Sequence, residues 1–184
     1  MWWSRLTLPD QHDWAEPAAV PKLHVWERPK ADPDPKAFAC YGLLVQHPSY
    51  PEEQVWLRFV EGRPVSAVTT AFLAWCSARL AAQGVTALVV IWDNASWHIS
   101  QEVRGWLRAH NHTVKRTGHG VRIVPCRLPT KSPWLNPIEP KWVHGKRAVS
   151  DSDRLLSATE LEARVYAYYG CAPEAHLLMP KKVA

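Results

Sequence analysis

The sequence predicts an α/β fold built on a sheet of mixed strand direction. Strand-like and helix-like segments follow in the order strand, strand, helix, strand, helix, strand, helix, helix along the 184 residues. Two adjacent strands favour an antiparallel hairpin, and the later strands alternate with helices, as parallel strands require. With 47% apolar and 21% charged residues, the composition supports a packed core and argues against a disordered chain.

The first two strands are predicted from apolar patterning between turn signals. Phe38–Gln46 is an apolar run that follows the turn-like segment Lys30–Lys36. Gln54–Val60 alternates apolar residues with polar or large ones. We expect the two strands to form a hairpin across His47–Glu53.

The next helix and strand are predicted from a change in periodicity. Pro64–Gln83 carries apolar residues at steps of three and four, with Pro64 suited to a first helical turn and Gly84 to a stop. Ala87–Trp92 is a continuous apolar run rich in β-branched residues. This composition is typical of a strand buried on both faces.

A second helix and strand follow in the same alternation. Ser100–Asn111 places its apolar residues on one helical face. Val121–Leu128 is predicted as a strand, and Pro125 restricts it to an edge or a short pairing.

The last two elements are helices. Asn136–Val149 is predicted to be helical from its first residue. Ser157 and Glu160 have the spacing of a capping box, which predicts a helix start. The apolar face of this last helix is expected to consist of Leu161, Val165 and Tyr168.

The sequence indicates a cytoplasmic protein. Ala87–Trp92, the longest apolar run in the strand-like centre, is far shorter than the roughly 20 residues of a bilayer span. The N-terminus has no basic stretch followed by an apolar core, so no secretory signal is expected. The four cysteines have no Cys-x-x-Cys spacing, which predicts buried, reduced thiols in place of a zinc site.

The net charge of +5 conceals one strongly basic segment. Residues 104–147 contain ten Lys or Arg and a single acid, Glu139, and therefore carry +9. A concentrated positive segment is typical of proteins that bind a phosphate-rich partner. The alternative is a solvated basic face without a partner.

The segment IWDNASWH places an acid directly after the central strand. Asp93 follows Trp92 at the carboxyl end of that strand, where α/β folds place their sites. The alternative is an Asx-turn that joins the strand to a helix. Three functions are open for His98. It is a core or surface histidine whose hydrogen bonds are satisfied locally, a group that supports Asp93, or a substrate contact.

The segment KSPWLNPIEPKW places the second candidate acid at a helix start. Asn136 suits an N-cap and Pro137 the first helical position, so that Glu139 stands at the third. Glu139 could therefore be a capping-box acid that reaches back to Asn136. Its basic surroundings favour a different function, a carboxylate that holds a divalent metal beside a bound phosphate.

Together the two acids suggest a magnesium site. Mg²⁺ prefers carboxylate oxygens and completes its shell with waters and substrate phosphates. Two such ions can activate a nucleophile and stabilise the leaving oxygen in phosphodiester displacement. We expect Asp93 and Glu139 as ligands, with Asn94, His98 and Asn136 in support. The expected contacts to the nucleic-acid backbone are Lys131, Lys141, Lys146 and Arg147.

IWDNASWH followed by LPTKSPWLNPIEPKW resembles the catalytic core of bacterial insertion-sequence DDE transposases of the mariner superfamily. The resemblance extends from about Trp2 to the last helix. It implies an RNase H-like fold and Mg²⁺-dependent cleavage and joining of DNA strands, with transposon ends and target DNA as partners. By this resemblance Asp93 is the second catalytic acid and Glu139 the third. It also implies two copies on DNA, a homodimer, because such transposases pair two ends.

The chain departs from this family at its start. The family's first catalytic aspartate ends the first strand, and the acids Asp10, Asp13 and Glu16 lie in a proline-rich stretch without a preceding apolar strand. We assign none of them as the first acid. We expect one RNase H-like domain over residues 1–184, truncated at its N-terminus, lacking the first strand and a helix-turn-helix region. Two alternatives remain: a catalytically dead DNA-binding remnant, and another RNase H-like nuclease.

Overall fold

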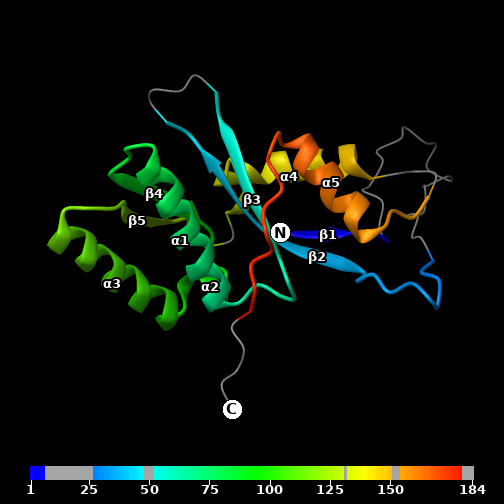
Figure 1. The fold of residues 1–184 in the computed structure, drawn as a ribbon, viewed down its shortest axis with the longest axis horizontal. Helices are drawn as coiled ribbons and strands as arrows, with labels where there is room; N and C mark the ends of the chain where they lie inside the picture. The colour runs from blue at the N-terminus through cyan, green and yellow to red at the C-terminus, as the bar shows by residue number, and fades with distance from the viewer. Residues whose placement is uncertain (7–26, 48–51, 131, 151–153, 180–184) are drawn as a thin grey trace, which may run out of the picture.

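The computed structural model of this chain describes residues 1–6, 27–47, 52–130, 132–150 and 154–179. It has the expected mixed α/β composition (Figure 1). The elements in chain order are β1 (Trp2–Ser4), β2 (Ala37–Val45), β3 (Gln54–Val60), α1 (Ser66–Ala82), β4 (Ala87–Trp92), α2 (Ser96–Ile99), α3 (Gln101–Thr117), β5 (Arg122–Arg127), the 3-10 turn η1 (Pro133–Leu135), α4 (Ile138–Val149) and α5 (Ala158–Tyr168).

The predicted hairpin is confirmed and forms two strands of a three-stranded antiparallel sheet in which β2 is the central strand. β2 and β3 pair in a register that runs from Ala39 opposite Val60 to Val45 opposite Gln54. β1 adds to the other edge of β2, with Trp2 opposite Ala39. The sequence did not predict β1 because three residues are too few to show a period. Its formation depends on tertiary contacts, above all the burial of Trp3.

The second sheet contains two parallel strands. β4 and β5 pair from Ala87 opposite Arg122 to Trp92 opposite Arg127. Pro125 lies opposite Val90, and β5 has a single neighbour, as the proline predicted. The expected single mixed sheet is not found in the described part of the chain, where the strands are split between two sheets. The reason is geometric, since β1 extends only along the start of β2 and makes no ladder with β4.

The prediction that β4 is buried on both faces is wrong. Val90 and Trp92 are buried, whereas Val89 and Ile91 are 61% and 48% exposed. On β5, Val124 shares the exposed face and Ile123 the buried one. A continuous apolar run does not distinguish one covered face from two, and here helices cover only one.

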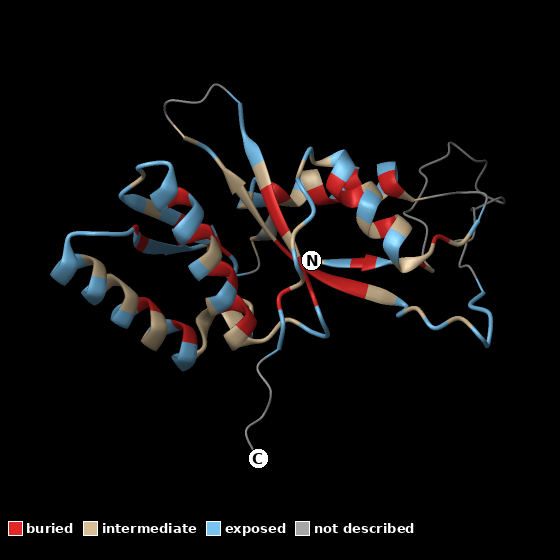
Figure 2. Cartoon of the chain, in the orientation of Figure 1, coloured by how far each residue is buried: buried red, intermediate tan, exposed pale blue. Residues whose placement is uncertain are grey.

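Helices on both faces of the first sheet build its core (Figure 2). α4 and α5 pack on one face through Trp142 and Val165 against Trp3 and Phe59. α1 packs on the other face around Phe72. A third cluster joins α1 and α3 to the buried face of β4 and β5. α1 therefore contributes to the cores of both sheets.

The helix of residues 64–83 forms with shifted ends. α1 has Val65 as its N-cap, so that Pro64 precedes the helix and does not occupy its first turn as predicted. Gly84 follows the C-cap with a positive φ of 75°, which confirms the predicted stop. In the described part of the chain, as expected, the helices are all too short or too polar to cross a membrane.

The helix predicted for residues 100–111 is longer than expected. α3 continues to Thr117 and ends at Gly118, which has a φ of 72°. Ser100 caps its start by accepting a hydrogen bond from the amide of Val103 at 3.2 Å. The polar second half of this helix carried no apolar period, so the prediction stopped at Asn111.

The two last helices differ in how well their starts were predicted. The Ser157–Glu160 capping box is present in both directions. The expected apolar face is wrong at Tyr168, which is exposed, whereas Tyr166 is buried. α4 begins two residues later than predicted, with Pro137 as its N-cap and no side-chain capping bond. The predicted capping function of Asn136 is therefore wrong, because η1 precedes the helix and shifts its start.

The cysteines are free thiols, as predicted, but they are not all buried. Cys40 and Cys76 are buried and Cys171 is half-buried. Cys126 is exposed because it lies on the uncovered face of β5, opposite Ile91.

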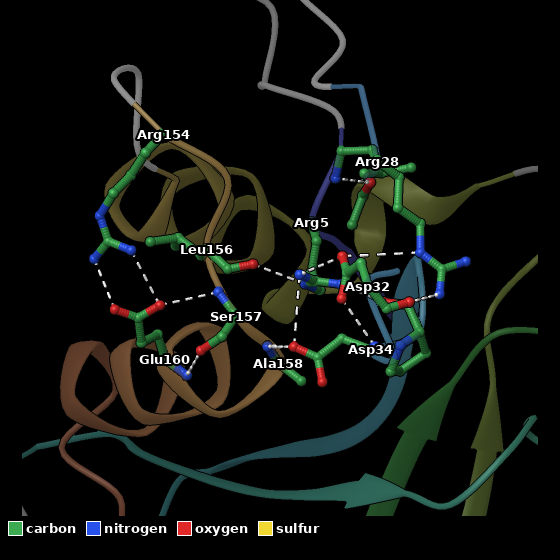
Figure 3. A network of polar contacts seen from close by, with 12 residues as sticks. Arg5, Arg28, Asp32, Asp34, Arg154, Leu156, Ser157, Ala158 and Glu160 are labelled. Atoms are coloured by element: carbon green, nitrogen blue, oxygen red, sulfur yellow. Dashed lines mark hydrogen bonds and ion pairs between the residues drawn. The ribbon is translucent and has the colours of Figure 1, made fainter. Parts of the chain in front are cut away.

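A buried arginine joins the end of β1 to the start of α5 (Figure 3). The Arg5 side chain is 3% exposed and pairs with Asp32 at 3.0 Å and with Asp34 at 3.5 Å. Its Nε donates to the carbonyl of Leu156 at 2.7 Å. Asp34 in turn accepts the first amide of α5, that of Ala158, at 2.7 Å. The predicted turn at residues 30–36 thus holds two chain segments together.

Candidate functional site

Asp93 leaves the carboxyl end of β4 with one carboxylate oxygen already engaged. Its Oδ1 accepts the amide of Ala95 at 3.0 Å and lies 2.8 Å from Nδ1 of His98. The Asx-turn and the contact with His98 therefore coexist on a single oxygen. In the described part of the chain Oδ2 has no donor, and the side chain is 51% exposed. The hydrogen bond from His98, with help from the Ala95 amide, lowers the pKa of Asp93 and keeps it ionised.

The orientation of His98 is fixed by aromatic rings. The imidazole stacks on Trp92, with centroids 5.1 Å apart and planes at 9°. The rings of Tyr41 and Trp97 approach it edge-on, at 6.4 Å and 6.0 Å. His98 can therefore hold Asp93 in one direction, with Nδ1–H as donor to the carboxylate.

Asn94 connects the end of β4 to the segment after β5. Its Nδ2 donates to the carbonyl of Leu128 at 2.8 Å, and the Leu128 amide donates to the carbonyl of Trp92 at 2.9 Å. These two bonds fix the backbone on either side of Asp93.

Glu139 lies in the first turn of α4, and its side chain is not a helix cap. The hydrogen bond near the helix start joins backbone groups, from the Glu139 amide to the Asn136 carbonyl at 3.0 Å. Burial raises the pKa of Glu139, and the negative charge of Asp93 raises it further. The positive charges of the Met1 amino group and Lys146 act in the other direction and lower it. Asp93 and Glu139, 46 positions apart in the chain, are thus close enough to interact electrostatically.

The Met1 amino group lies within electrostatic range of both acids. It donates to the Cys40 carbonyl at 2.9 Å and feels the charges of both Glu139 and Asp93. Burial lowers the pKa of this amino group. No sequence pattern predicted this interaction, because it depends on the pairing of β1 with β2.

Close packing holds α4 on the sheet. A Cβ atom at Gly42 would overlap the ring of Trp142, and one at Gly145 would overlap the ring and hydroxyl of Tyr169. The Tyr169 hydroxyl donates to the carbonyl of Lys141 at 2.8 Å. Two glycines thus let the helix that carries Glu139 approach the sheet closely.

The predicted basic contacts lie in different places. Lys146 is the one whose charge reaches Glu139. Lys141 forms an ion pair with Glu53 at 2.7 Å on the side of β3. Arg147 is exposed. Lys131 lies outside the described residues.

Carboxylates of the kind found at Asp93 and Glu139 are the ligand type that a hard divalent cation prefers. Among the described residues no group of three or more His, Cys, Asp or Glu side chains is arranged to hold a metal. Mg²⁺ is often bound by one or two carboxylates with waters and substrate phosphates. The carboxylates available for such binding are the unbonded Oδ2 of Asp93 and the half-buried side chain of Glu139.

A family comparison gives this arrangement its context. The model of the DDE superfamily endonucleases matches residues 51–162, a segment that includes both Asp93 and Glu139. The chain belongs to this family. Membership implies an RNase H-like fold, a DNA substrate and the use of divalent metals. No curated protein and no solved structure matches the chain.

The structure adds site residues that the sequence did not identify. Trp92 and Tyr41 support His98, and Gly145 lets α4 pack closely. Trp92 was recognisable as the neighbour of Asp93, but its ring points into the core beside α3 and its function emerges only from the stacking. Tyr41 and Gly145 carried no sequence signal, because each acts on a residue far away in the chain.

Proposed function

We propose that this chain is the catalytic domain of an insertion-sequence transposase that cleaves and transfers DNA strands, with Asp93 and Glu139 as its metal ligands. The observation that carries the proposal is electrostatic: the charge of Asp93, at the end of β4, raises the pKa of Glu139 in the first turn of α4. Carboxylates that raise one another's pKa are typical of centres that bind a cation. Family membership supports DNA as the substrate.

The side chains around the pair would prepare it for phosphodiester chemistry. A divalent ion bound there supplies Lewis-acid activation of the scissile phosphate and of the attacking hydroxyl or water. Asp93 stays ionised and directed by His98, so that Oδ2 remains available. Asn94 fixes the strand end behind it, and Lys146 places a positive charge where a DNA phosphate would approach. Asn136 supports the start of α4 through its carbonyl.

The proposal is tested by nicking of supercoiled plasmid with Mg²⁺ or Mn²⁺. We expect metal-dependent nicking by the unmodified chain, and loss of at least about 100-fold in Asp93→Asn and in Glu139→Gln, because each removes one ligand. Glu61→Gln is the matched control, since Glu61 is an exposed acid beyond β3. Equal activity in all variants would contradict the assignment.

A second candidate function is DNA binding without cleavage. It is favoured by the absence, among the described residues, of a third acid beside Asp93 and Glu139. Salt-sensitive DNA binding without nicking in the presence of either Mg²⁺ or Mn²⁺ would support a catalytically dead DNA-binding remnant and overturn the catalytic proposal. Cleavage of RNA but not of transposon-end DNA would point to another RNase H-like nuclease.

A further inference from the structure

α3 presents a row of cations that the proposed catalytic site does not use. The row consists of Arg104, Arg108 and Lys115, which are all exposed. At 100° per residue, their spacing of four and seven residues places them within about 40° of one another around the helix. At 1.5 Å per residue the row is about 16 Å long.

The side of α3 that adjoins this row is fixed to the sheet. Only Val103 and Leu107 are buried, against the covered face of β4 and β5 (Figure 2). Asn111 brackets Ile123, donating to its carbonyl at 2.7 Å and accepting its amide at 2.8 Å. His110 Nε2 contacts the Val121 carbonyl at 2.8 Å. These contacts hold the backbone of α3, and with it the row of cations, in a fixed position on the sheet.

The cations of the row are not neutralised by the protein. In the described part of the chain Arg104, Arg108 and Lys115 form no ion pair, and the only acid on α3 is Glu102 in its first turn. Arg108 Nε donates to the backbone carbonyl of Arg104 at 3.4 Å, which leaves the rest of its guanidinium open. An unpaired row of one sign costs stability through self-repulsion and is typical of a surface that meets polyanions.

The row begins next to the candidate site. α2, which carries His98, is followed directly by Ser100 and α3. In Figure 1, α3 leaves the neighbourhood of α2 and runs to the outer edge of the molecule. A duplex bound at Asp93 could therefore continue along α3, where about 16 Å corresponds to roughly five base pairs of B-DNA.

We propose that the Arg104–Arg108–Lys115 row is a second DNA-binding surface, which contacts the phosphate backbone of duplex DNA beyond the cleavage site. The inference rests on the proposed function for the identity of the polyanion. The contacts would be independent of base sequence, because Arg and Lys side chains that meet phosphates position a duplex without reading it.

The test compares the salt dependence of duplex DNA binding in two triple variants. One is Arg104→Gln/Arg108→Gln/Lys115→Gln. The other removes the same charge from exposed sites outside α3, Lys30→Gln/Lys36→Gln/Arg63→Gln. Three lost phosphate contacts should reduce the slope of log K against log salt by about 2–3 in the α3 variant. The control should keep the slope of the unmodified chain, and equal melting temperatures would confirm that both variants fold.

The outcomes separate this surface from the catalytic proposal. If the α3 variant keeps the slope of log K against log salt of the unmodified chain, the proposed DNA-binding surface is wrong, even if nicking still requires Asp93. The same loss of slope in the control also overturns it, because the effect would then follow net charge alone. A reduced slope confined to the α3 variant supports the surface, even if no variant cleaves DNA. Absence of DNA binding by the unmodified chain contradicts both proposals.

Discussion

Gly145→Ala is expected to destabilise the protein although alanine favours helices. The new methyl group would overlap the Tyr169 ring and hydroxyl and lie 3.2 Å from the ring of Trp3. These rings cannot move freely, since Trp3, Trp142 and Tyr169 contact one another edge-to-face with centroids 5.4 to 6.2 Å apart. The displaced Tyr169 would also lose its hydrogen bond to Lys141.

The expected magnitude follows from three opposing contributions. Overpacking costs about 1–3 kcal/mol, the lost hydrogen bond costs about 1 kcal/mol, and replacing helical glycine by alanine recovers about 1 kcal/mol. The net loss is therefore about 1–3 kcal/mol, which lowers the melting temperature by roughly 2–12 °C in a chain of this size. Nicking activity should fall as well, because α4 carries Glu139.

Thermal and urea unfolding followed by circular dichroism measure this loss. Gly105→Ala is the matched control, because Gly105 lies in α3 and a Cβ atom there meets nothing within 4 Å. That variant should be as stable as the unmodified chain or up to about 1 kcal/mol more stable. Tyr169→Phe should partly restore Gly145→Ala by removing the overlapping hydroxyl. Equal stabilisation by Gly145→Ala and Gly105→Ala would refute the close packing of α4.

Three further predictions follow from the polar contacts. Arg5→Ala should lower the urea midpoint. The Asp34 amide and Arg5 lower the pKa of Asp32, so their stabilisation of the folded state exists at neutral pH and is lost on acidification. Without Arg5, the free energy of unfolding should depend less on pH between about 5 and 3. His98→Ala should reduce nicking about 10–100-fold and shift the acidic limb of its pH profile upward, because the pKa of Asp93 rises. Ser157→Ala should cost about 1 kcal/mol in urea unfolding.

Elements set by local chemistry were predictable from the sequence. The start of α5 follows from Ser157 and Glu160, whose side chains form the capping box within one turn. β3 has the predicted bounds, although both of its faces are buried: Leu57 and Phe59 lie in one core cluster and Trp56 and Val60 in the other. The acids Asp93 and Glu139 were recognisable because each stands where an element ends or begins.

Features that depend on distant contacts were not predictable. β1 forms only because β2 supplies its partner and Trp3 is buried by α4 and α5. The open face of β4 at Val89 could not be inferred, because hydrophobicity does not show how many helices cover a strand. The start of α4 moved past Asn136 because a 3-10 turn precedes it.

The central claim is that Asp93 and Glu139 are metal ligands, and Mn²⁺ binding measured by electron paramagnetic resonance tests it most directly. With duplex DNA present, the unmodified chain and Glu61→Gln should deplete free Mn²⁺ equally, because Glu61 lies outside the site. Asp93→Asn and Glu139→Gln should each weaken this binding at least about tenfold, because a carboxylate ligand is lost. Unchanged Mn²⁺ affinity in either variant would contradict the claim.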